Sequence, residues 1–500
     1  MTSQQRDPFP LAGGITYQAV EADYFEKRGL KRYAGIWSLW ALGVGAVISG
    51  HFSGWNLGLA VGGWGGMLIA AGIMAVMFLA LSFCIAEMSA SLPFNGGSYS
   101  FARMALGPFW GFVSGLCEHI EYVLTPAVIC YFIGAYLGAI LGPDVPPLVW
   151  WVGTYVLFMA LNMAGVALTF RVTLVVTLIS LAVLVFFCAI ALPHIDFGRW
   201  AMNIAADGSE LPNGGGAFLP MGYASIGACL PFAVWLYLAI EELPMASEEA
   251  IDPKRDMPRG ILLALGTLIA TAFLIATINP AVMGVGAHRL GQSGEPVLDG
   301  FRAIFGGVGA DILGLIALSG LIASFHAILF AQGRQIFALS RSGYLPRFLS
   351  LTHSSRKTPI IAMIFGCGVG LAFMVALTAF SGSKGVSDAH IGGLLLNMAV
   401  FAAMLSYLSR AAAFLVLRAR HADLPRPFVS PLGRFGAWIT IVICLATLAY
   451  QLRDAAFLDG VVWVVIWISF GIAYFLGIAR HQLVLSPDEA AAIDRLSRPA

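Results

Sequence analysis

Residues 40–55 read WALGVGAVISGHFSGW, an apolar run that contains four glycines and a histidine. Glycine costs about 1 kcal/mol relative to alanine inside a helix, so this run is poor helix material. It lies within a longer apolar segment, 37–60, that has the length of a membrane-spanning helix. Backbone freed by a break cannot face lipid, because nothing there can pair with it. The run therefore predicts a broken membrane helix whose break lines a cavity or is buried against protein.

A second interrupted stretch, residues 231–244, reads PFAVWLYLAIEELP. It has a proline at each flank and two acids, Glu241 and Glu242, inside it. Interrupted helices at matching places in two halves of a chain usually indicate the binding site of a transporter. Ordinary kinks are the alternative, since Gly and Pro are common in membrane helices. Both interruptions coincide with polar residues, which favours a binding site.

The composition indicates an all-α integral membrane protein. The chain has 500 residues, of which 59% are hydrophobic and 11% charged, against about 25% charged in a soluble domain. The net charge of +1 gives no indication of a nucleic-acid partner. We find no phosphate-binding loop, no metalloprotease helix motif, no nucleophile elbow and no metal-ligand cysteine spacing. We therefore expect no enzyme activity, no metal and no cofactor.

Twelve apolar runs predict twelve transmembrane helices, two of them broken, the first and the sixth. They are residues 37–60, 62–83, 108–141, 148–166, 172–192, 221–247, 261–284, 310–339, 359–380, 391–417, 435–451 and 461–478. We expect a cytoplasmic segment 1–33, a transporter domain 34–480 and a cytoplasmic tail 481–500. Within the domain, 37–192 form the first repeat, 221–417 the second, inverted repeat, and 435–478 two extra helices.

The positive-inside rule gives the orientation. With the N-terminus inside, the external loops hold only 5 of the 28 Lys and Arg residues: Arg199, Arg289, Arg302, Lys384 and Arg453. Both termini are therefore predicted to be cytoplasmic, with the chain crossing the inner (cytoplasmic) membrane many times. The N-terminus shows no signal peptide, so we expect the first apolar run to be a retained helix.

Buried acids are the second functional signal. Glu118 and Glu121 are three residues apart in the third span and share one helix face. A charge at the bilayer centre costs roughly 2.5–3.5 kcal/mol, so such residues usually face the bundle interior. No Lys or Arg clearly lies at comparable depth, which suggests that a cationic ligand or a proton balances them. The alternative is that the acids cap freed backbone or pair with His119.

The residues around the breaks allow two interpretations. His51 lies in the first break and titrates near neutral pH when unperturbed, or it is a hydrogen-bonded core histidine. Phe52, Trp235 and Tyr237 flank the breaks, where aromatic faces attract a cation. Aromatic rings are also common in helix packing, so they are supporting evidence only.

Several motifs resemble the amino acid–polyamine–organocation (APC) superfamily. They are GVGAVISG at 43–50, AEMSASLPFNGGSY at 86–99, EEAIDPKRDMPRG at 248–260 and SRSGYLP at 340–346. Within it the chain looks most like the ethanolamine permeases, through WALGVGAVISG at 40–50, EHIEYVLTPA at 118–127 and WLYLAIEE at 235–242. The resemblance implies a five-plus-five inverted repeat (the LeuT-like fold) and a small amino alcohol as substrate. Such an amine, with a pKa near that of lysine at about 10, is protonated at neutral pH.

One position departs from the family pattern. Many sodium-independent amino acid members carry a lysine in the fifth helix, and the matching residue here is Ser180. Ser180 is then either a cation ligand or a helix hydroxyl bonded to its own backbone. The coupling ion is therefore a proton or sodium, and the candidate coupling residues are His51, Glu118 and Ser180.

The leading hypothesis is a secondary active transporter that imports ethanolamine or a similar small primary amine by alternating access, coupled to protons. The expected partners are that amine, the coupling ion and membrane lipid. We assign the substrate's ammonium group to Glu241, Glu121 and Glu118. The walls of the site are assigned to Trp235, Tyr237 and Phe52. The substrate's hydroxyl group is assigned to the backbone of Ser49, Gly50 and His51. An amino acid permease of the same superfamily is the alternative. A receptor would need a sizeable signalling domain, and a membrane enzyme would need a metal or nucleophile cluster.

Overall fold

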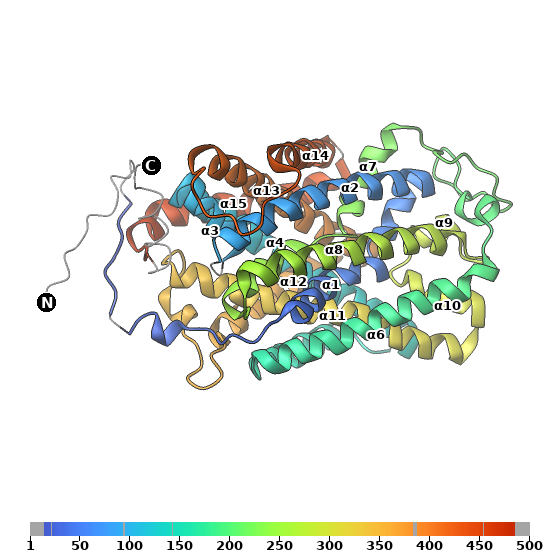
Figure 1. The fold of residues 1–500 in the computed structure, drawn as a ribbon. Helices are drawn as coiled ribbons and strands as arrows, with labels where there is room; N and C mark the ends of the chain where they lie inside the picture. The colour runs from blue at the N-terminus through green and yellow to red at the C-terminus, as the bar shows by residue number, and fades with distance from the viewer. Residues whose placement is uncertain are drawn as a thin grey trace, which may run out of the picture.

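The computed structural model describes residues 15–485 except 22, 94–95, 143, 384–387 and 454. Among these residues the chain is helical, and extended pairing is limited to isolated bridges. Figure 1 shows an elongated bundle whose helices run mostly along its length. Tyr17 pairs with Leu483, so the first and last described segments meet at one end, which we call the termini end. Helices α9 and α10 lie at the opposite end, the far end.

The helices alternate with short 3-10 and π turns. The α-helices are α1 (Ile36–Phe52), α2 (Gly58–Ser91), α3 (Gly97–Leu106), α4 (Pro108–Leu141), α5 (Pro147–Met163), α6 (Val166–Ala191), α7 (Ala224–Val234), α8 (Pro253–Ile278), α9 (Gly286–Leu290), α10 (Pro296–Phe305), α11 (Gly307–Arg341), α12 (Ile360–Ser383), α13 (Asp388–Arg420), α14 (Gly433–Arg453) and α15 (Ala455–Gly477). The short turns are η1 (Glu26–Arg28), η2 (Trp55–Leu57), η3 (Leu192–His194), the π-turn η4 (Phe197–Ala201), η5 (Ile240–Glu249), η6 (Asn279–Ala281), η7 (Arg347–Ser350) and η8 (Ala479–His481).

The membrane crossings agree with the twelve predicted runs. Within the described residues, nine apolar helical segments are long enough to cross a bilayer. One of them, Ile36–Ser91, doubles back at Gly63, which has a φ of 67°, and so supplies two crossings. Helix α5 and the pair α7–η5 are shorter and supply the fourth and sixth. The predicted third span, 108–141, has the same bounds as α4. The short helices α3, α9 and α10 were not predicted, because they are not long apolar runs.

The first crossing is broken between α1 and η2. Ser53 is extended, and Gly54 has a φ of 94°, a left-handed conformation that side chains disfavour. A Cβ at Gly54 would also lie 2.6 Å from the indole nitrogen of Trp235. Glycine is therefore required here both by conformation and by space.

The sixth crossing is broken between α7 and η5. Residues 235–239 form a turn, and Ala239 has a φ of 83° although it is not glycine. Such a conformation costs of order 1–3 kcal/mol and persists only where the surroundings impose it. The chain then continues as the ten-residue 3-10 helix η5, which contains Pro244. Both predicted breaks are therefore confirmed, each with a residue at positive φ, and at Ala239 that conformation is strained.

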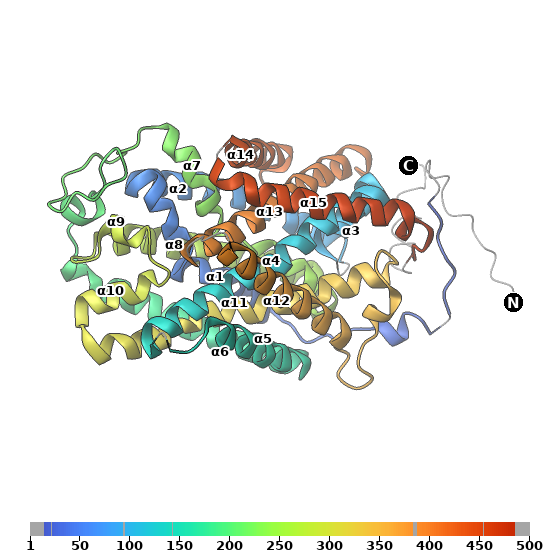
Figure 2. The same ribbon diagram turned by 180° about the vertical axis from the view of Figure 1, so that it is seen from behind.

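The helices of the two halves interleave. Helix α1 packs on α8, α11 and α6, and α2 packs on α7 and α8. Helix α4 packs on α11 and α13, which makes it a central element of the bundle. Seen from behind, α15 runs along the outside of the bundle next to α13 (Figure 2). The broken crossings are thus enclosed by other helices, as freed backbone requires.

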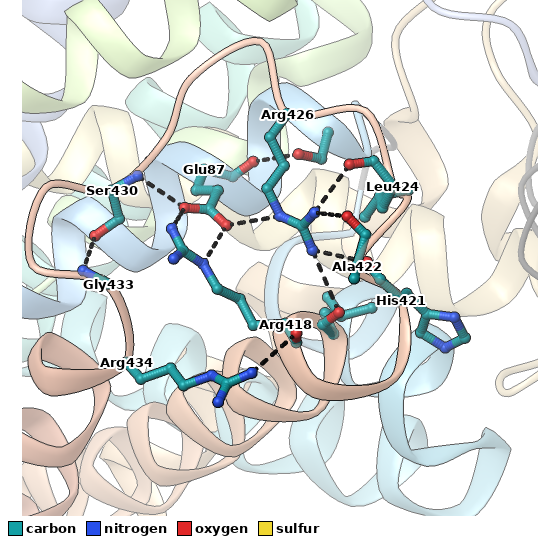
Figure 3. Close-up of polar contacts among 11 residues, drawn as sticks. Glu87, Arg418, His421, Ala422, Leu424, Arg426, Ser430, Gly433 and Arg434 are labelled. Carbon is teal, nitrogen blue, oxygen red and sulfur yellow. Dashed lines mark hydrogen bonds and ion pairs between the residues drawn. The ribbon is translucent and has the colours of Figure 1, made fainter.

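Carboxylate–arginine contacts tie the termini end together. Glu87 of α2 accepts from Arg418 Nε at 2.9 Å, from Arg426 Nε at 3.1 Å and from the backbone N–H of Ser430 at 2.7 Å (Figure 3). A second pair, Glu249 and Arg334, joins η5 to α11 at 2.8 Å with both side chains fully buried. The segment leading into α1 adds to this closure, because the N–H groups of residues 33 and 34 donate to the Glu249 carbonyl.

Candidate functional site

The two breaks lie in direct contact. The indole N–H of Trp235 donates to the carbonyl of Ser53 at 3.1 Å. The imidazole Nε2 of His51 lies 3.2 Å from the carbonyl of Leu236. A Cβ at Gly50 would lie 2.1 Å from the carbonyl oxygen of Trp235, so only glycine allows this approach. Side chains of each broken helix therefore satisfy carbonyls that the other break has freed.

His51 is a satisfied core histidine in this structure. It is fully buried, and its Nδ1 lies 3.4 Å from the hydroxyl of Thr271 on α8. The carbonyl of Leu236 can only accept, so the proton of that bond belongs to Nε2. Nδ1 then faces Thr271 as an acceptor. The sequence allowed either a titrating histidine or a hydrogen-bonded core histidine, and the geometry matches the second.

The freed backbone begins later than we expected. We placed it at Ser49, Gly50 and His51, but all three residues are helical in α1. The N–H of Ser49 donates to the hydroxyl of Ser324 on α11 at 2.8 Å, and its carbonyl accepts from the N–H of Ser53 at 3.0 Å. The Ser324 hydroxyl also donates to the Gly45 carbonyl at 2.6 Å, so it bridges the Ser49 N–H and the Gly45 carbonyl within α1. The non-helical break follows at residues 53–54.

The aromatic residues assigned to the walls are anchored by their polar groups. The Tyr237 hydroxyl donates to the carbonyl of Ala71 at 3.2 Å, and its ring lies 5.5 Å from that of Phe78. The Phe52 ring fills space above Gly320 of α11, and the Phe52 carbonyl accepts from the hydroxyl of Tyr136 at 2.9 Å. These two rings and that of Trp235 lie at or next to the breaks, and we call them the aromatic layer.

Glu118 has a protein cation as its partner, which corrects our expectation that none lies at its depth. Arg410 of α13 contacts the Glu118 carboxylate, and both side chains are buried, at 1% and 0% exposure. The backbone N–H of Ser98, at the start of α3, donates to the same carboxylate at 3.2 Å. Glu118 is therefore already neutralised within the protein.

Glu121 and Glu241 form a second pair without such compensation. Their carboxyl groups face each other, and the hydroxyl of Tyr407 lies 3.5 Å from Glu121 Oε1. Among the described residues, no well-formed hydrogen bond reaches either oxygen of Glu241 or of its neighbour Glu242. Two carboxylates in contact cannot both stay ionised unless a cation or a proton joins them. This pair is the strongest candidate for a binding or coupling site.

The acids lie next to the sixth break and on the termini side of the first. Glu241 follows Ala239 by two positions, and Tyr237 and Tyr407 both pack on Phe78. Tyr136, which contacts the first break, and Glu121 are fifteen residues apart, or about 22 Å along α4. Helix α4 starts at the termini end, where Pro108 accepts from Tyr344. The acids therefore lie between the first break and the termini end, and they are sealed at 0–1% exposure.

Ser180 is bonded to its own helix. Its hydroxyl donates to the carbonyl of Val176 at 2.7 Å and lies 3.3 Å from the hydroxyl of Ser319 on α11. Two neighbouring hydroxyls are engaged with α1: Thr177 donates to the Ala41 carbonyl and Ser324 to the Gly45 carbonyl. Among the described residues, no group of three His, Cys, Asp or Glu side chains could hold a metal ion.

Sequence reasoning missed two residues that the structure brings to the acids. Tyr407 and Arg410 of α13 were not assigned roles, although they are three positions apart in the middle of a predicted span. That spacing puts both side chains on one face. Two polar side chains on one face of a predicted span would have indicated these residues from the sequence.

Known proteins resemble this chain over nearly its whole length. The amino acid permease family model matches residues 35–480. The methylthioribose transporter of Bacillus subtilis is 26% identical over 92% of this chain and 96% of that protein. The branched-chain amino acid permease of the same organism is 26% identical over 91% of this chain and 95% of that protein. The rat large neutral amino acids transporter small subunit 2 is 25% identical over 87% and 81%. The chain therefore belongs to the amino acid permease family of the APC superfamily, with its five-plus-five inverted repeat, and is a membrane transport protein rather than an enzyme.

Proposed function

We propose that this permease imports ethanolamine or a similar small primary amine, with the ammonium group held by Glu241 and Glu121. The observation that carries the proposal is the excess of buried acid. Among the described residues, no ion pair joins Glu121, Glu241 or Glu242 to a Lys or Arg, whereas Arg410 forms an ion pair with Glu118. A monocationic substrate would supply the missing positive charge, and its entry would be favoured by electrostatics in a medium of low dielectric constant.

The rest of the site supports a small substrate. The breaks already pack against each other through Gly50 and Trp235. This close packing favours a substrate of only a few heavy atoms. The aromatic layer of Phe52, Trp235 and Tyr237 would close over the ammonium group from the far end. Glu118 would not contact the substrate. It would position α13 beside the other acids through its ion pair with Arg410.

Proton coupling is the part of the proposal that concerns Glu121 and Glu241. When no amine is bound, a shared proton would allow the two carboxyl groups to remain in contact. The amine would bind to the remaining negative charge of the pair with that proton still in place. Release of both the amine and the proton on the inside would let an inward proton gradient drive import. His51 and Ser180 have less support as coupling residues, because the hydrogen bonds of both are already satisfied.

The orientation and location are also proposed. We infer that the termini end faces the cytoplasm and that the protein lies in the inner membrane. The support is the charge distribution, since only 5 of 28 Lys and Arg residues fall in the loops assigned to the outside. The acids would then lie on the cytoplasmic side of the first break.

An amino acid substrate is the second candidate. The named relatives that support it are the branched-chain amino acid permease and the rat large neutral amino acids transporter subunit. A zwitterion would bring its own carboxylate to a region that already holds four acids and one committed arginine. The electrostatics of the site thus favour an amine, and the relatives favour an amino acid.

Uptake into proteoliposomes distinguishes these candidates. Labelled ethanolamine would be offered with and without an inward proton gradient, and with sodium replaced by potassium. We expect saturable uptake that is driven by the proton gradient and is indifferent to sodium. Uptake of a labelled neutral amino acid, with no uptake of ethanolamine, would replace the proposed substrate by an amino acid. Uptake that requires sodium would contradict proton coupling and direct attention to Ser180.

A further inference from the structure

Residues 290–296, which link α9 to α10, cover the first break at the far end. We call them the lid segment. The Ser53 hydroxyl donates to the carbonyl of Gly294 at 2.7 Å. The Asn56 amide donates to the carbonyls of Leu290 at 2.6 Å and Ser293 at 2.8 Å. These three bonds join the lid segment to residues on both sides of Gly54, so the lid cannot leave without uncovering the break.

Tyr136 couples the lid to α1 from the other side. Its hydroxyl donates to the carbonyl of Phe52 at 2.9 Å and lies against the backbone N–H groups of Val297 and Leu298 in the first turn of α10. The start of α10, the lid segment and the first break therefore form one connected unit. A change at the start of α10 is transmitted to the break through a single side chain.

Glu295 is the ionisable group inside this unit. It is the residue before α10 and is partly buried. Its neighbour Asp299 follows four residues later on the same face, where a like charge is unfavourable. The Ser293 hydroxyl donates to Asp299 at 2.5 Å and accepts from the Glu295 N–H at 3.0 Å. Ser293 thus ties the Asp299 carboxylate to the backbone at Glu295, which fixes the two acidic residues one turn apart.

The nearest cation is committed elsewhere. Arg302 of α10 donates to Asp311 of α11 at 2.9 Å and 3.2 Å, and to the carbonyl of Ala139 of α4 at 2.8 Å. From α6 and η6, the residues that face the start of α10 are Phe187 and Asn279, which do not titrate. Tyr136 of α4 completes the surroundings. Within the described residues, Glu295 therefore meets the like charge of Asp299, while Arg302 is paired with Asp311 and His288 of α9 contacts Gln292 of the lid at 3.3 Å.

We propose that Glu295 is a proton-controlled latch of the lid: protonated, it lets the lid segment rest on the first break, and ionised, it loosens that closure. In the orientation inferred above, this latch responds to external pH. The inference does not depend on the identity of the substrate. It requires only that the chain is a permease whose first break must open to one side.

The electrostatics set the direction and the range of the response. Burial raises the pKa of Glu295 from 4.5 to about 7, with Asp299 acting in the same direction and Arg302 opposing it. A pKa that is higher in the closed lid means that closing takes up a proton. Closure is therefore strongest at low pH and weakens as pH rises between about 4.5 and 7, after which it is constant.

Spin-label distances test the latch without any substrate. Labels would be attached to cysteines introduced at Gln292 in the lid and at Val308, an exposed residue at the start of α11. The native cysteines are all buried, so they react little. We expect the wild-type protein to gain a population of longer distances between pH 5 and pH 8, with the ratio of open to closed lid rising by more than tenfold, up to about seventyfold.

Two variants and a control make the test decisive. Glu295→Gln mimics the protonated acid and should keep the short distances at both pH values. Asp299→Asn removes the like charge and should move the transition to lower pH. Asp207→Asn, in the preceding far-end loop, should behave as the wild type. An unchanged wild-type distribution across this range, or a Glu295→Gln response equal to that of the wild type, would overturn the proposal.

Discussion

Two pairs of buried residues lie one helical turn apart on α4, and they differ in charge balance. Glu118 meets Arg410, and the pair is neutral. Glu121 meets Glu241, another acid, and Glu242 adds a third carboxyl group nearby. All of these side chains are almost completely buried, so exposure does not distinguish the two pairs. The charge of the partner residue distinguishes them. It indicates a structural role for the Glu118–Arg410 pair, and ligand or proton binding for the Glu121–Glu241 pair.

The largest effect is expected from Glu241→Gln, which removes one charge of the uncompensated pair and keeps the shape. Uptake should fall at least a hundredfold, because the proposed ammonium contact is lost. The protein should remain folded, since an amide that replaces an uncompensated buried carboxylate lowers the cost of burial. Radiolabel uptake and thermal unfolding in detergent measure the two results. Near-normal uptake by this variant would refute the assigned role of Glu241.

The compensated pair should respond in the opposite way. Arg410→Gln leaves Glu118 buried without its cation, which typically costs about 3–5 kcal/mol of stability. The midpoint of thermal unfolding should therefore fall markedly. The double variant Glu118→Gln, Arg410→Gln should recover most of that loss, because no unpaired charge remains. If Arg410→Gln unfolds at the wild-type temperature, the pair is not the structural tie described here.

Comparing Glu121→Gln with that double variant isolates the function of each pair. Glu121→Gln should raise the KM for the amine about tenfold, since one of two charged contacts, worth about 1.4 kcal/mol, is removed. The double variant should keep the KM within about threefold of the wild type. Initial rates over a range of amine concentrations give both values. Equal losses in the two variants would mean that Glu118 contacts the substrate after all.

Local sequence patterns predicted the crossings and both breaks, because span length and glycine content are properties of the segment itself. They did not predict the position of the first break. The backbone at Ser49 is bonded by the hydroxyl of Ser324 on α11, which is 275 residues away in the sequence. The partner of Glu118 was missed for the same reason, since Arg410 is 292 residues distant. Which acid is neutralised is a property of the packed bundle.

The smallest effect is expected from Tyr407→Phe, which removes a single hydroxyl group beside Glu121. Tyr407 of α13 reaches Glu121 with its hydroxyl at 3.5 Å, a long contact that contributes little. Tyr407→Phe keeps the ring, which packs 5.6 Å from Phe78. Loss of a weak hydrogen bond of about 0.5–1 kcal/mol should raise the KM two- to fivefold and leave the thermal midpoint unchanged. Because Tyr407 and Arg410 share one face of α13, this variant separates the two pairs without moving the helix. A fall in thermal stability as large as that of Arg410→Gln would show that Tyr407 belongs to the structural tie rather than to the ligand site.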